Sequence, residues 1–67
     1  MNTATLNFCG DTLEVVWTGS VWQAPCNGTQ HSTASAAMRE ELTRHIISCG
    51  DDPEDYDLGE ILINMIL

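Results

Sequence analysis

Hydrophobic and polar residues alternate along the first third of the chain. Such a period of two is typical of strands with one buried face. A turn signal at residues 10–11 separates two alternating runs, a second turn signal follows at residues 18–20, and residues 21–24 form a candidate third strand that ends at Pro25. The pattern predicts an antiparallel β-hairpin or a three-stranded sheet, with residues 25–30 as a loop. The apolar positions of the two runs are Leu6, Phe8, Leu13, Val15 and Trp17.

The spacing changes to three and four residues in the middle of the chain. Ser32 and Thr33 can each cap a helix start, because a hydroxyl oxygen accepts from free amides of the first turn. Gly50 is a suitable stop for this helix. The spacing predicts a helix over about residues 32–49 with one apolar face. That face holds Ala34, Met38, Leu42, His45, Ile46 and Cys49.

The last part of the chain fits two structures. Asp52 followed by Pro53 and acidic residues is a good helix start. Residues 58, 61, 62, 65 and 66 are apolar and fit one helical face. Gly59 and three isoleucines oppose a helix, and the rival is a strand over residues 60–67 that adds to the hairpin. We expect a C-terminal helix over about residues 53–66, and hence a single α+β domain spanning residues 1–67.

Charge is the strongest compositional signal. The 67 residues carry ten acidic and two basic side chains, for a net charge of −8. Six of the ten acids fall within residues 51–60, and no lysine is present. Because 43% of the residues are hydrophobic and patterned, this is a folded domain and not a disordered acidic tail. Such a domain repels nucleic acid and anionic membranes, and it is attracted to basic surfaces.

The sequence contains residues that could bind a metal or catalyse a reaction, but not the motifs that such sites require. Three cysteines form no disulfide framework, and we expect them to be reduced and partly buried. Zinc donors are present without the spacing of a zinc motif, no calcium-loop register fits residues 51–60, and no catalytic motif stands out, so we expect no metal, no cofactor and no enzymatic activity. Trp17 and Trp22 favour the core, with Trp22 the more exposed. The potential zinc donors are Cys9, Cys26, His31, His45 and Cys49.

In size, lack of lysine, charge and the acidic run of residues 51–57, the chain resembles the small acidic phage proteins that block host defence, especially anti-CRISPR proteins that mimic DNA. The resemblance implies an inhibitor that occupies a DNA-binding groove of a CRISPR effector subunit. The partner is then a basic nucleic-acid-binding protein, with no direct contact to nucleic acid or membrane. The expected contact residues are Asp51, Asp52, Glu54, Asp55, Asp57, Glu60, Glu40 and Glu41.

A second hypothesis belongs to a different class. The apolar residues 61–67 favour a small structural or adaptor subunit that assembles through this segment, for example in a phage particle or a dimer. The sequence leaves open whether the chain is a monomer or a dimer. No signal peptide is evident in the first residues, so we expect a cytoplasmic location in the host cell.

Overall fold

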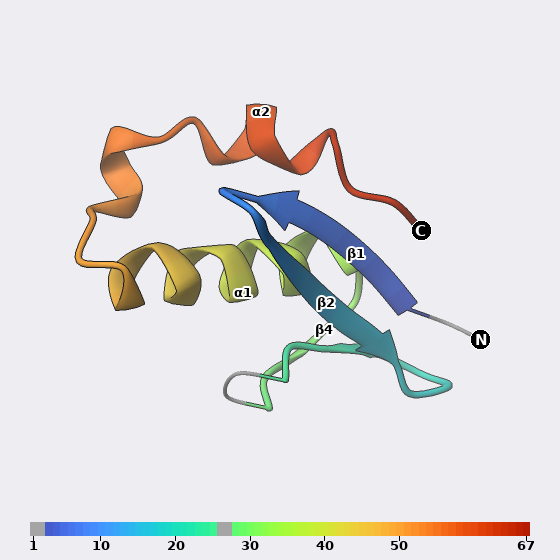
Figure 1. The fold of residues 1–67 in the computed structure, drawn as a ribbon. Coiled ribbons are helices and arrows are strands. Elements are labelled where there is room, and N and C mark those ends of the chain that lie inside the picture. The colour runs from blue at the N-terminus through green and yellow to red at the C-terminus, as the bar shows by residue number, and fades with distance from the viewer. Residues whose placement is uncertain (1–2, 26–27) are drawn as a thin grey trace.

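The computed structural model describes residues 3–25 and 28–67 and shows a small α+β fold (Figure 1). Four antiparallel strands form one sheet in the order β1-β2-β3-β4. They are β1 (Thr3–Phe8), β2 (Asp11–Trp17), β3 (Trp22–Gln23) and β4 (Gln30–His31). The helices are α1 (Ala34–Ser48), the 3₁₀ turn η1 (Pro53–Asp55) and α2 (Leu58–Leu62). The predicted fold class is confirmed, and β4 is an additional strand where a loop was expected.

The hairpin forms where the alternation predicted it, with the turn one residue earlier. Cys9 and Gly10 connect the strands with φ angles of 51° and 84°. Positive φ at both positions of a two-residue turn matches the twist of paired strands. The register then sets Leu6 opposite Leu13 and Ala4 opposite Val15, so all four buried side chains point to one face of the sheet.

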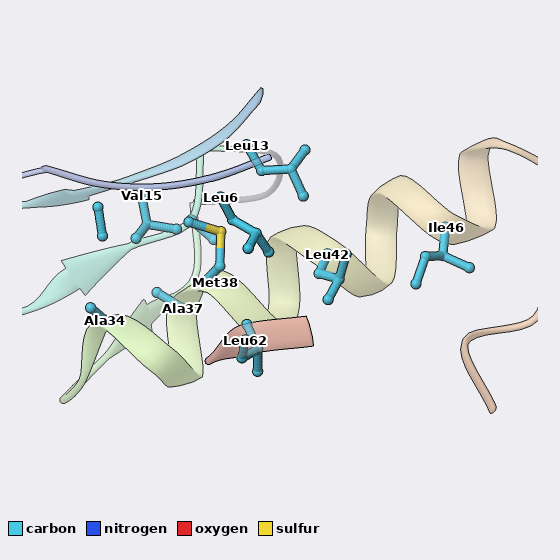
Figure 2. Close-up of a cluster of buried hydrophobic side chains, with 11 residues drawn as sticks. Leu6, Leu13, Val15, Ala34, Ala37, Met38, Leu42, Ile46 and Leu62 are labelled. Carbon is cyan, nitrogen blue, oxygen red and sulfur yellow. The ribbon is translucent and has the colours of Figure 1, made fainter. Parts of the chain in front are cut away.

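Helix α1 covers that face and completes the core (Figure 2). Thr33 caps the helix, since its Oγ1 accepts from the backbone amide of Ala36 at 3.1 Å. The buried side chains of α1 recur every three or four residues, as predicted, and Leu62 from α2 joins them. Burial of each large aliphatic side chain contributes about 1.5–3 kcal/mol. The helical contributors are Ala34, Ala37, Met38, Leu42, Ile46 and Leu62.

The C-terminal helix is much shorter than the expected 53–66. Tyr56 is extended, with φ −117° and ψ 146°, and this separates η1 from α2. Asp57 then caps α2, which ends at Leu62. Ile66 returns to an extended conformation and pairs with Thr5 at the edge of the sheet. The C-terminal region therefore has features of both the expected helix and the rival strand, because the short helix α2 is followed by a single β-bridge at Ile66.

The expectation that the cysteines are partly buried is wrong for the two that the structure describes. Cys9 and Cys49 are free but exposed: Cys9 is at the hairpin turn, and Cys49 caps the end of α1. Trp17 and Trp22 are both half-buried; Trp22 packs against the core cluster, and the centroids of the two rings lie 5.6 Å apart. Cys26 lies outside the described residues.

Candidate functional site

Residues 51–60, called the acidic segment from here on, are held in shape partly by their own carboxylates. Asp52 accepts a hydrogen bond from the backbone amide of Glu54 at 3.0 Å and so starts η1. Asp57 does the same for α2 through the amide of Glu60, at 3.2 Å. Asp51 accepts from the Tyr56 hydroxyl at 3.1 Å. Three of the predicted contact residues therefore have a structural role.

The other three acids of the segment do not cap a helical turn or bind Tyr56. Glu54, Asp55 and Glu60 are exposed. Within the described part of the chain, their carboxylates make no hydrogen bond or ion pair. They lie on short helical turns whose starts are fixed by Asp52 and Asp57. The segment therefore presents three unpaired negative charges on an ordered backbone.

Tyr56 fastens the acidic segment to the rest of the domain. Its ring packs against the core cluster and meets Phe8 edge-on, with centroids 5.7 Å apart. The hydrogen bond to Asp51 raises the pKa of Tyr56 above its ordinary value of 10.0, and partial burial and nearby negative charge add to this shift. The hydroxyl thus stays protonated near neutral pH and keeps donating to Asp51.

Glu40 and Glu41 lie apart from the acidic segment, on α1. Glu40 pairs with Arg44 at 3.6 Å, and both glutamates are half-buried. Arg39 lines a shallow groove with Glu40 and a second one with Glu54 and Asp57. A cation therefore stands between Glu40 and the acidic segment, and the expected set of contact residues does not form one continuous acidic surface.

The remaining polar cluster joins the hairpin turn to the end of α1. His45 Nε2 lies 3.2 Å from Asp11 Oδ2 and 3.8 Å from Cys49 Sγ. In a nucleophile–base–acid relay, the acid and the nucleophile bind opposite nitrogens of the imidazole. Here both approach the same nitrogen, and the Phe8 ring meets His45 edge-on at 5.9 Å. This geometry suits an anchor between hairpin and helix.

The potential zinc donors named from the sequence do not come together in the described residues. His31 lies on β4, with its Nε2 atom 3.3 Å from Thr29 Oγ1. It is therefore on a different element from His45 and Cys49. Among residues 3–25 and 28–67, no group of three or more histidine, cysteine, aspartate or glutamate side chains is placed to hold a metal ion. The expectation of no bound metal stays a prediction for the whole chain.

Sequence reasoning located the acidic segment but missed how Tyr56 anchors it. The five-residue separation of Asp51 and Tyr56 matches no motif, and the two side chains meet where the Tyr56 ring packs on Phe8. No family model, curated protein or solved structure matches the chain. No helix in the described residues has the length and apolar character needed to span a membrane.

Proposed function

We propose that the chain is an inhibitor that binds a basic, nucleic-acid-binding protein through the acidic segment and blocks binding of target DNA. The partner is proposed to be a CRISPR effector subunit in the cytoplasm of the host cell. The chain acts by occupying a surface and catalyses no reaction. The observation that carries this proposal is the set of unpaired carboxylates of Glu54, Asp55 and Glu60 on an ordered backbone.

The physical basis is competition for the same cations. B-form DNA carries one negative charge per about 1.7 Å of its axis, and its protein partners present lysine and arginine to it. The acidic segment offers fixed carboxylates to such side chains, and the sequence contains no lysine or arginine after Arg44. Preorganised charge of this kind speeds encounter with a basic groove and disfavours binding to other acidic surfaces.

The test separates the position of the charges from their number. One variant combines Glu54→Gln, Asp55→Asn and Glu60→Gln. The control combines Glu14→Gln, Glu40→Gln and Glu41→Gln, which removes the same number of charges elsewhere and also breaks the ion pair between Glu40 and Arg44. Both leave the caps Asp52 and Asp57 and the Asp51–Tyr56 contact in place.

Each variant is then assayed for competition with a target DNA duplex on purified, guide-loaded CRISPR effector complexes at several salt concentrations. We expect the segment variant to lose at least about tenfold in affinity, or about 1.4 kcal/mol, and to bind with a weaker salt dependence. The control should stay close to the unchanged chain. Equal losses in both variants would show that net charge alone acts, and an unchanged segment variant would contradict the proposal.

A further inference from the structure

A shallow groove runs between α1 and the acidic segment. Arg39 lines it from α1, and residues 53–54 and 56–59 line it from the acidic segment. We call it the segment groove. Its apolar side chains are half-buried, and two of them, Tyr56 and Leu58, pack against the core cluster. The walls of the segment groove are therefore held in place by the fold.

The segment groove carries an excess of negative charge. Within residues 3–25 and 28–67, the Glu54 carboxylate makes no hydrogen bond or ion pair. Asp57 Oδ1 accepts from the Glu60 amide at 3.2 Å, and its other carboxylate oxygen makes no such contact in these residues. Arg39 forms no ion pair there with either acid. Two carboxylates against one guanidinium leave the groove with one net negative charge.

Gly59 points to a ligand independently of these charges. It lies inside α2, although glycine is the least favourable residue in a helix interior after proline. Its φ angle is not in the left-handed region, and a β-carbon at this position would meet only Asp57 Oδ1, at an ordinary 3.6 Å. Neither the backbone nor the packing requires a glycine. The missing side chain instead leaves space in the segment groove, which Gly59 lines.

We propose that the segment groove receives an arginine side chain of the basic partner. This inference rests on the proposed function, because it names the group that the acidic segment binds. Glu54 and the unused oxygen of Asp57 are acceptors for guanidinium N–H groups, and Pro53 and Leu58 offer apolar surface to the aliphatic stem. Arginine suits the groove better than lysine, because its guanidinium is planar, weakly hydrated and able to stack on an aromatic ring such as Tyr56.

A blocked tripeptide with arginine between two glycines tests the inference on the chain alone. Its titration into the isotope-labelled chain is followed by NMR at low salt, and the same tripeptide with lysine is the comparison. We expect the arginine peptide to shift the amides of Arg39 and residues 54–59 and to bind at least about threefold more tightly than the lysine peptide. Equal affinity for the two peptides, or shifts centred elsewhere, overturns the inference.

Gly59→Leu fills the groove without changing its charge. Leucine favours a helix, so the fold should be kept, and we expect the affinity for the arginine peptide to fall at least about fivefold through steric exclusion. Circular dichroism checks the fold, and the smaller change Gly59→Ala is used if the first variant unfolds. The matched control is Ser35→Leu, at an exposed position of α1 outside the groove. Equal losses in the groove variant and the control would contradict the inference.

Arg39 supplies a test with the opposite sign. Its charge repels a second guanidinium, so Arg39→Gln should bind the arginine peptide more tightly than the unchanged chain. The control Arg44→Gln removes the same charge, but Arg44 pairs with Glu40 and lines a different groove. Its effect should be smaller. A gain that is equal in both variants would show that net charge acts and not the segment groove.

The same variants separate this inference from the proposed function. If Gly59→Leu competes with target DNA on a CRISPR effector complex as well as the unchanged chain, the arginine site is wrong while the proposed function stands. If the arginine peptide binds in the segment groove but the chain competes on no CRISPR effector complex, the proposed function is wrong while the arginine site stands.

Discussion

The acidic side chains of residues 51–60 fall into two groups according to their hydrogen bonds. Asp51, Asp52 and Asp57 satisfy a hydroxyl or backbone amides that would otherwise lack a partner. A carboxylate near the start of a helical turn is also favoured by the helix dipole. Among residues 3–25 and 28–67, the carboxylates of the remaining three acids make no hydrogen bond or ion pair. Substitutions in the first group will therefore change structure and charge together, whereas substitutions in the second change mainly charge.

Tyr56 provides a direct probe of the first group. We expect Asp51→Asn to lower the pKa of Tyr56 toward 10.0, because the strongest cause of the raised pKa is the hydrogen bond to the Asp51 carboxylate. Since the pKa is higher in the folded state than in the unfolded state, this contact stabilises the fold at pH below about 10. That contribution is lost as the pH rises through the folded-state pKa.

The chain has one tyrosine, so a near-ultraviolet absorbance titration reports Tyr56 alone. Asp52→Asn is the control, because the side chain of Asp52 binds the Glu54 amide and not the Tyr56 hydroxyl. A pKa that moves equally in both variants would show that general charge, and not this hydrogen bond, sets the value.

At the scale of elements, local signals explain the hairpin and α1 but only part of the C-terminal region. Alternation and the Thr33 cap act within a few residues, so the sequence predicted these elements. The extent of α2 depends on long-range contacts. Tyr56 leaves the helical conformation where it packs on Phe8, and Ile66 does so where it pairs with Thr5. Helical spacing in residues 58–66 could not reveal those partners.

The contribution of α2 can be measured through Leu62. It is the only buried residue of α2, with 9% of its surface exposed, and it belongs to the same core cluster as Met38 and Leu42 (Figure 2). We expect Leu62→Ala to lower the free energy of unfolding by about 2–5 kcal/mol, because lost burial and the remaining cavity both act. A domain of this size has a margin of only about 3–5 kcal/mol, so the variant should be largely unfolded near body temperature.

Urea denaturation followed by circular dichroism measures the effect. Ile63→Ala is the matched control, since Ile63 is adjacent in sequence but 74% exposed, and such surface changes stay within about 0.5 kcal/mol. Similar losses in both variants would mean that α2 does not hold the core through Leu62. Both chains are compared at low concentration, which keeps self-association out of the measurement.

At the scale of the whole molecule, composition predicted the charge and its clustering, and the fold distributes that charge unevenly. Glu40 and Glu41 could be assigned to a helix from the sequence, but the position of Arg39 between Glu40 and the acidic segment could not be predicted. Grouping of side chains across elements depends on packing that spacing does not encode. The same applies to the contact between Asp11 and His45, which are 34 positions apart.

The net charge of −8 also opposes folding, which gives a prediction for the whole domain. The folded chain measures 33 × 21 × 18 Å, so its acids are close enough to repel one another when the Debye length is about 30 Å at 0.01 M salt, and far less so at about 3 Å in 1 M salt. We therefore expect the melting temperature to rise with sodium chloride. A gain of about 1 kcal/mol corresponds to roughly 4–8 °C for a domain of this size.

The variant with Glu54→Gln, Asp55→Asn and Glu60→Gln should melt higher than the unchanged chain at low salt and respond less to added salt. Calorimetry at low chain concentration measures both effects. A melting temperature that stays constant or falls as salt is added would show that repulsion among the acidic side chains does not destabilise the folded chain. Binding to a basic partner should weaken over the same salt range, so stability and binding are expected to respond to salt with opposite signs.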